Sequence, residues 1–143
     1  MTAPVLSVKQ IETLLRKEFP QVFHAQSGLT IVDVTASGCR VTQAFSESFV
    51  RPGGTISGPT MMALADFTMY VAVLAAAGPV PLAVTTNLTI NFLRKPAQSD
   101  LIADARLLKR GKRLVVGEVT IHSQGIAEPV AHVTATYSIP PPR

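Results

Sequence analysis

One stretch of twenty residues, Gly58 to Ala77, constrains the fold of this chain more than any other, because it carries a single charged side chain. It begins Gly-Pro and is followed by Gly78-Pro79, a pattern that predicts one helix of about 30 Å. Apolar side chains lie on every face of that helix. A helix that is apolar all round belongs in a core, so a sheet must curl around it or a second subunit must cover what the sheet leaves open.

A transmembrane helix is the alternative for this stretch, and its sequence argues against one. It is barely long enough to cross a bilayer, it starts Gly-Pro, and it holds Asp66 near its centre, where lipid makes a charge costly. Segments with β patterns also flank it closely on both sides. We therefore expect no membrane span.

Asp66 is the anomaly of this helix. Its neighbours three and four positions away are Met62, Ala63, Met69 and Tyr70, and none of them can neutralise it. A carboxylate left bare among such groups is costly. Asp66 is therefore expected to find a hydrogen-bond donor across an interface, to face a wet cleft, or to act as a catalytic acid or base.

The segment before the helix reads Arg-Pro-Gly-Gly-Thr-Ile-Ser-Gly-Pro over residues 51–59 and must be a loop. Backbone N–H groups at a helix start are unpaired and partly positive, and Gly58 leaves them open to an anion or a developing oxyanion. Gly58 precedes Asp66 by about two turns, or ~12 Å. One substrate group reaches both only if it is extended or if Asp66 belongs to a different subunit. The simpler alternative is that the glycines only shape the turn.

The remaining segments predict one short helix and six strands. Ser7 is the expected N-cap of a helix that Pro20 ends. Short connections among the last four strands favour an antiparallel meander. One long helix against one sheet makes an α+β domain, here a single domain over residues 1–143. The predicted strands are Leu29–Val34, Arg40–Phe49, Ala83–Leu93, Leu101–Lys109, Leu114–Ser123 and Val130–Ile139. Alternation in the third of these places Thr86 and Leu88 on one face and Thr85 on the other.

Composition excludes several classes of protein. With 47% hydrophobic and 15% charged residues the chain is not a disordered tail. A single cysteine, Cys39, makes no intrachain disulfide and argues against a cysteine-ligated zinc site. His122 and His132 could be adjacent in strands, but two ligands do not define a zinc site, so no metal is predicted. The N-terminus lacks the pattern of a secretory signal, so we expect a cytoplasmic protein.

Basic residues are concentrated in one segment. Seven lie between Arg94 and Arg113, opposed only by Asp100 and Asp104, so this segment carries +5 and the rest of the chain −1. A local basic patch suggests an anionic partner. The segment has no aromatic residue for base stacking, so we expect a small phosphorylated ligand rather than nucleic acid. The alternative is a solvated hairpin whose charges serve solubility.

Taken in order, these features resemble the hotdog-fold acyl-CoA thioesterases, in particular the phenylacetate-pathway and hydroxybenzoyl-CoA branch. The resemblance covers roughly Leu29–Ile139. The family's Asn, Gly, His-Gly-Gly and helix acid correspond in spacing to Arg51, Gly54, 57–59 and Asp66. Residues 84–94 resemble the family's strand with a Thr or Ser, and residues 111–118 its hairpin of glycine and basic residues. The resemblance implies a sheet wrapped around a central helix, with two protomers joined edge to edge.

The resemblance also implies the roles of the site residues. Asp66 would be the catalytic carboxylate, as general base for water or as nucleophile on the thioester carbonyl. The Gly58 N–H would polarise that carbonyl, and Thr85 would place the water. No cofactor is implied beyond the coenzyme A of the substrate, and the assembly would be a homodimer or homotetramer. The implied substrate-binding residues are Arg51, Ser57, Pro59, Arg94, Lys95, Arg110, Lys112 and Arg113, the basic ones after Pro59 meeting the phosphates of coenzyme A.

The chain departs from the family at two positions. Arg51 replaces the usual Asn, and could pair with Asp66 across an interface or bind a carboxylate on the acyl group. Ser57 replaces the usual His and could still donate a hydrogen bond. The alternative function is therefore a non-catalytic acyl-CoA or lipid-binding module on the same fold. A hotdog hydratase would pair the Asp with a His about five positions on, where this chain has Val71, and an unrelated β-rich binding protein is the last alternative.

Overall fold

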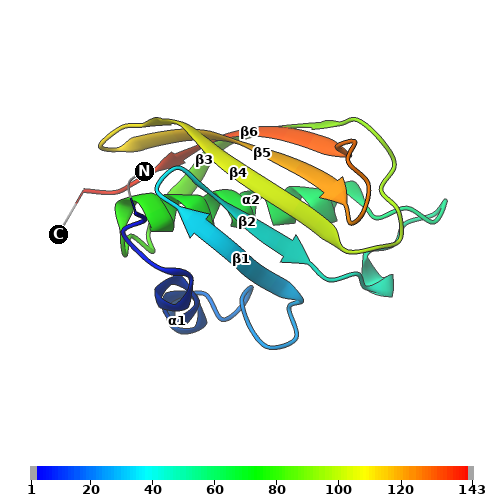
Figure 1. The fold of residues 1–143 in the computed structure, drawn as a ribbon, viewed down its shortest axis with the longest axis horizontal. Helices are drawn as coiled ribbons and strands as arrows, with labels where there is room; N and C mark the ends of the chain where they lie inside the picture. The colour runs from blue at the N-terminus through cyan, green and yellow to red at the C-terminus, as the bar shows by residue number, and fades with distance from the viewer. Residues whose placement is uncertain (1–2, 142–143) are drawn as a thin grey trace.

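The structure is a computed structural model that describes residues 3–141. Six strands form one antiparallel sheet that curves around a long helix, and a shorter helix lies beside the first strand (Figure 1). This confirms the predicted α+β architecture, the one that the hotdog resemblance implied. The elements are α1 (Val8–Glu18), β1 (Leu29–Thr35), β2 (Gly38–Gln43), α2 (Gly58–Ala77), β3 (Val84–Phe92), β4 (Leu101–Arg110), β5 (Leu114–Ser123) and β6 (Ala131–Ser138).

The long helix α2 forms the centre of the core. It contacts all six strands of the sheet, and the side chains of Leu64, Met69 and Leu74 are at most 2% exposed. Burying each such side chain contributes about 1.5–3 kcal/mol. The hydroxyl of Thr68, also buried, donates to the Leu64 carbonyl one turn earlier at 2.6 Å. The helix is long and apolar enough to cross a membrane, but most of it is covered inside the protein, as expected of a core helix.

The strand order, β1-β2-β4-β5-β6-β3, corrects one prediction. β4, β5 and β6 form the expected meander, but β3 pairs with β6 and not with β4. The predicted four-strand meander is therefore wrong for β3. Residues 93–100 link β3 to β4, and eight extended residues span up to about 26 Å, enough to pass the two intervening strands, β6 and β5, at about 4.8 Å between neighbours. β3 is thus an edge strand, and its outer edge has no strand partner within residues 3–141.

The predicted second strand is also too long. β2 ends at Gln43, well before Phe49. The Ser46 hydroxyl accepts the N–H of Ser48 and starts a single turn of 3-10 helix over Glu47–Phe49. The backbone N–H of Phe45 donates to the Asp100 carboxylate at 2.8 Å, so side chains replace the sheet as hydrogen-bond partners here.

The boundaries of both helices follow the sequence signals. Ser7 caps α1 in a reciprocal pair with Gln10, as the N-cap prediction required. α1 ends at Glu18, two residues before Pro20. α2 begins and ends at the predicted residues.

The chain's one cysteine gives a direct test of the core. Cys39 is buried on β2, and its S–H donates to the Thr68 carbonyl of α2 at 3.2 Å. Burial, with lesser effects from Asp33 and Asp104, raises the pKa of the Cys39 thiol well above its usual range. The thiolate is the nucleophile, so alkylation by iodoacetamide should stay slow from pH 7 to pH 9 and become fast in denaturant. Rapid labelling of the folded protein would contradict this packing.

Candidate active site

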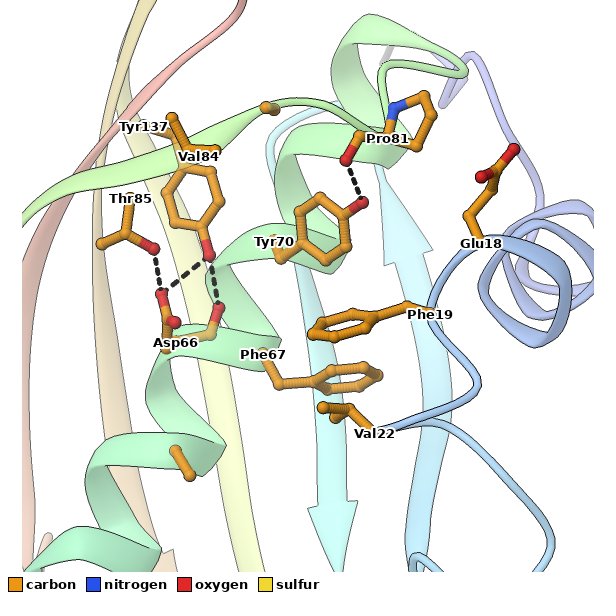
Figure 2. Close-up of a pocket in the computed structure, with 12 residues that line it drawn as sticks. Glu18, Phe19, Val22, Asp66, Phe67, Tyr70, Pro81, Val84, Thr85 and Tyr137 are labelled. Carbon is orange, nitrogen blue, oxygen red and sulfur yellow. Dashed lines mark hydrogen bonds between the residues drawn. The ribbon is translucent and has the colours of Figure 1, made fainter.

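The carboxylate of Asp66 is held by two hydroxyl groups from the sheet. Thr85 of β3 donates to Asp66 Oδ1 at 2.6 Å. The Tyr137 hydroxyl, from β6, lies 2.7 Å from the same oxygen and 3.0 Å from the Asp66 backbone carbonyl (Figure 2). Asp66 itself is half-buried. Hydrogen-bond donors to the lone charge of α2 therefore come from its own protomer.

Thr85 reaches Asp66 because β3 is irregular at its start. The register between β3 and β6 shifts between Thr85 and Asn87, which marks a β-bulge. A bulge inserts an extra residue and so breaks the alternation of side chains between the two faces. Thr85 and Leu88 consequently line the same hollow beside α2. The prediction from alternation, which placed them on opposite faces, is wrong.

Two hollows meet at Asp66. The larger is about 440 Å³ and lies between α1, α2 and the start of β3. The smaller, about 380 Å³, extends along α2 towards Pro59 and Met62 in its first turns. Ala63, Asp66 and Thr85 line both. An extended ligand can therefore place one end in each hollow and its middle beside the carboxylate.

Aromatic rings form much of the wall of the larger hollow. Tyr70 stacks on Tyr137 with ring centroids 6.0 Å apart and meets Phe19 edge-on at 6.1 Å. The Tyr70 hydroxyl donates to the Pro81 carbonyl at 2.8 Å (Figure 2). Burial raises the pKa of both tyrosines, so their hydroxyls stay protonated. Phe67 is a further wall residue. The hollow suits an apolar or aromatic group, and the end of α1 supplies part of its wall through Glu18 and the C-cap residue Phe19.

The start of α2 lies at the other end of β3. Ser57 is its N-cap: the hydroxyl accepts the Thr60 N–H at 3.4 Å and lies 2.8 Å from the Thr60 hydroxyl. Gly58 lies against the ring of Phe92. A Cβ atom at position 58 would be 3.1 Å from the end of that ring. Asp66 is bound to Thr85 at the start of β3, and Phe92 is its last residue. Within one protomer, Gly58 and Asp66 are thus at opposite ends of β3.

The basic segment does not form one patch within a protomer. Arg94 and Lys95 lie two and three residues after the end of β3, and the Arg94 guanidinium donates to the Pro129 carbonyl at 2.8 Å. Arg110, Lys112 and Arg113 lie in the β4–β5 hairpin at the opposite end of the sheet, where Leu114 pairs with Ser138 and Ser138 with Val84. All five side chains are exposed.

Three other charged side chains of the segment have partners: Asp104 pairs with Arg40 at 2.7 Å, the Asp100 carboxylate accepts the Phe45 N–H, and Arg106 meets Glu118. Arg106 pairs with Glu118 at 2.8 Å, and His132 lies 3.0 Å from the other oxygen of Glu118. These hydrogen bonds lower the pKa of Glu118, that from Arg106 most. Within the described part of the chain no three metal-ligating side chains come together. Arg51, in an exposed loop, bonds through its backbone to Thr55 at 2.9 Å.

The sequence analysis did not single out Tyr137. Its position in the pattern of β6 resembles that of any core residue, and its partner Asp66 is 71 residues away in the chain. Only a register assignment that set Tyr137 opposite Thr85 would have brought the two hydroxyls together.

Comparison with known proteins identifies the family. Residues 53–130, more than half of the chain, match the model of the thioesterase superfamily. A crystal structure of a candidate thioesterase from Silicibacter sp. TM1040 is 40% identical, with a TM-score of 0.85 over 98% of this chain and 96% of that one. A candidate esterase from Saccharolobus solfataricus is 29% identical over 83% of this chain and 77% of its own length. The crystal structure of a Streptococcus mutans UA159 protein bound to acetyl-CoA is 21% identical, with a TM-score of 0.74 over 84% and 94% of the two chains.

The fold is therefore the hotdog fold, and the protein is a hydrolase of the thioesterase type. The chain belongs to the thioesterase superfamily, and the resemblance deduced from the sequence is confirmed at that level.

The Ser57 hydroxyl provides a test of its role as the helix cap. Ser57→Ala should lower the free energy of unfolding by about 1 kcal/mol, because the Thr60 N–H loses its acceptor. Ser57→Asp keeps an acceptor and should retain wild-type stability. Urea denaturation of the three proteins measures both effects, and equal stability of Ser57→Ala and wild type would show that the cap contributes nothing.

Proposed function

We propose that this protein hydrolyses the thioester of an acyl-CoA or arylacyl-CoA, releasing the free acid and coenzyme A. Asp66 has one of two roles. As general base it activates a water molecule that attacks the thioester carbonyl carbon; as nucleophile it attacks that carbon itself. The observation that carries the proposal is the position of its carboxylate, half-buried between an apolar hollow and a second hollow that follows α2 to its first turn. No cofactor is needed beyond the coenzyme A of the substrate.

The two hollows suit the two halves of such a substrate. An acyl group fits the larger one, whose wall is largely aromatic and aliphatic. The pantetheine arm of coenzyme A is narrow and extended, and the smaller hollow leads it away along α2. The acetyl-CoA found in the Streptococcus mutans relative supports a CoA thioester as ligand. Exposed basic side chains at both ends of the sheet are available for the phosphates.

We propose that the active unit is at least a homodimer in which the β3 strands of two copies pair antiparallel. The outer edge of β3 has no partner within residues 3–141, and Val84 and Phe92 at its two ends are 57% and 50% exposed. A two-fold axis between the two β3 strands sets the start of one strand beside the end of the other. Asp66 of one copy then lies near Gly58 of the second copy, whose N–H polarises the carbonyl.

The same pairing explains the divided basic segment. In one protomer Arg94 and Lys95 lie at the sheet end opposite the Arg110–Arg113 hairpin. Antiparallel pairing of β3 brings the hairpin end of one copy beside the Arg94 end of the other. Each site then has basic residues from both copies for the phosphates of coenzyme A.

The second candidate is a non-catalytic acyl-CoA or lipid-binding module. It is favoured by the state of the two residues that depart from the family pattern: the Ser57 hydroxyl is engaged as the α2 cap, and Arg51 is exposed in its loop. On this alternative Asp66 only orients the ligand.

Release of free thiol from a panel of acyl-CoA esters tests the proposal. Asp66→Asn removes the basic oxygen and should lower kcat by about 10²- to 10⁴-fold, the usual contribution of a positioned acid or base. Asp33→Asn, which alters an exposed carboxylate on β1, is the matched control and should keep wild-type kcat. Binding of CoA esters without turnover by the wild type would favour the binding module.

Mixed dimers test the shared site. Gly58→Pro removes the N–H at the first position of α2, where proline is tolerated. Neither Gly58→Pro nor Asp66→Asn homodimers should be active. After subunit exchange in equal amounts, about a quarter of the sites in the mixture should be intact if each site combines two copies. No recovery in exchanged dimers would place both residues of each site in one copy.

A further inference from the structure

Only one of the two carboxylate oxygens of Asp66 is held by hydrogen bonds. This asymmetry adds a further role to the site proposed above. We infer that Tyr137, a residue assigned no function above, is a positioning residue: with Thr85 it fixes Asp66 Oδ1, so that Oδ2 is the oxygen that acts on the water or the carbonyl carbon. This inference rests on the proposed thioester hydrolysis and names the atom that performs it.

The hydrogen bonds to the carboxylate are unequally divided. Oδ1 is 2.6 Å from the Thr85 hydroxyl and 2.7 Å from the Tyr137 hydroxyl. Such lengths are typical of hydroxyl donors to an ionised carboxylate. Oδ2 receives no hydrogen bond from any described residue, and Figure 2 shows it without a partner. A carboxylate oxygen that accepts two short hydrogen bonds is a weaker base than its free neighbour, so the reactive atom is Oδ2.

The two donors are placed by the sheet rather than by α2. Thr85 and Tyr137 are directly opposed across the β3–β6 pair, so both hydroxyls reach the helix from one point. Their bonds to a single oxygen fix the plane of the carboxylate, because rotation of the group would break both. Thr85 is exposed, whereas Tyr137 is only 3% exposed. The buried donor is therefore the more firmly held.

Packing keeps the Tyr137 hydroxyl in place. Its ring stacks on Tyr70 with an interplanar angle of 20°. Burial raises the pKa of Tyr137 well above its usual range, an effect that the nearby Asp66 charge reinforces. The phenol therefore stays protonated and remains a donor at neutral pH. Tyr70 itself bonds to the Pro81 carbonyl at 2.8 Å and not to Asp66.

The chemical step follows from the free oxygen. In the general-base route Oδ2 takes a proton from water while the water oxygen bonds to the carbonyl carbon. The C–S bond then breaks, and the departing thiolate of coenzyme A receives that proton. In the nucleophilic route Oδ2 itself bonds to the carbonyl carbon and the C–S bond breaks, so that the thiolate leaves. Water then cleaves the resulting anhydride, which releases the free acid and restores the Asp66 carboxylate, and the proton lost by that water protonates the thiolate. Tyr137 touches no reacting atom in either route.

Tyr137→Phe tests the inference, because it removes one hydroxyl and keeps the ring. We expect kcat on the best acyl-CoA ester to fall about 10- to 100-fold with KM within about threefold of wild type, as for a lost hydrogen bond to a charged group. Tyr70→Phe removes the neighbouring hydroxyl of the same wall. Its kcat should exceed that of Tyr137→Phe, because its hydroxyl bonds to the Pro81 carbonyl and not to Asp66, and melting temperatures of both variants control for folding.

A double variant separates positioning from a merely structural role. If Tyr137 acts through Asp66, adding Tyr137→Phe to Asp66→Asn should cost no further kcat, because the two residues work as a unit. The same further loss in both backgrounds would overturn the inference. Should Tyr137→Phe fail to fold, Thr85→Val removes the other bond to Oδ1 and should show the same dependence on Asp66.

The outcomes also separate this inference from the proposed function. Full turnover by Asp66→Asn would reject the proposed chemistry itself. Loss of turnover in Asp66→Asn with wild-type kcat in Tyr137→Phe would reject only the positioning role.

Discussion

Enclosure of α2 by the sheet is the constraint on which the rest of the structure depends. A helix apolar on every face has to be covered, and the six strands curve around it to do so (Figure 1). The sheet covers α2 incompletely on the side next to β3, because β3 is the last strand of the sheet. Asp66 lies on that side. The same packing that buries the helix thus leaves one place where a charge can be solvated and a ligand can enter.

Hydrogen bonds from the sheet offset the free-energy cost of placing a carboxylate on such an apolar helix. Thr85 and Tyr137, opposed on neighbouring strands, supply two short hydrogen bonds to one oxygen. The bulge in β3 is what turns Thr85 towards the helix. The irregularity in β3 therefore lets the sheet stabilise a carboxylate that would otherwise destabilise the core. The second oxygen of this carboxylate stays free beside the two hollows. This arrangement needs the tertiary fold and cannot form on an isolated helix.

Sequence reasoning succeeded where the signals are local and failed where they are distant. The bounds of α2 were predicted because Gly-Pro at each end stops or starts a helix, and Asp66 stood out because no neighbour three or four positions away can neutralise its charge. Pairing of β3 with β6 was missed because the partners are separated by β4 and β5. Tyr137 carried no local mark, and the bulge that turns Thr85 does not alter the composition of β3. The basic segment is continuous in sequence but divided in space. β4 runs from one end of the sheet to the other and so separates Arg94 and Lys95 from the β4–β5 hairpin.

The most direct test of the account is a crystal structure with a non-hydrolysable acyl-CoA analogue in which a methylene group separates the carbonyl from sulfur. We predict that its carbonyl carbon lies within about 3.5 Å of Asp66 Oδ2, the distance of a near-attack geometry, or one water molecule away. The acyl group should fill the hollow walled by Phe67 and Tyr70. A carbonyl nearer to Oδ1, or an acyl group outside that hollow, would contradict the account.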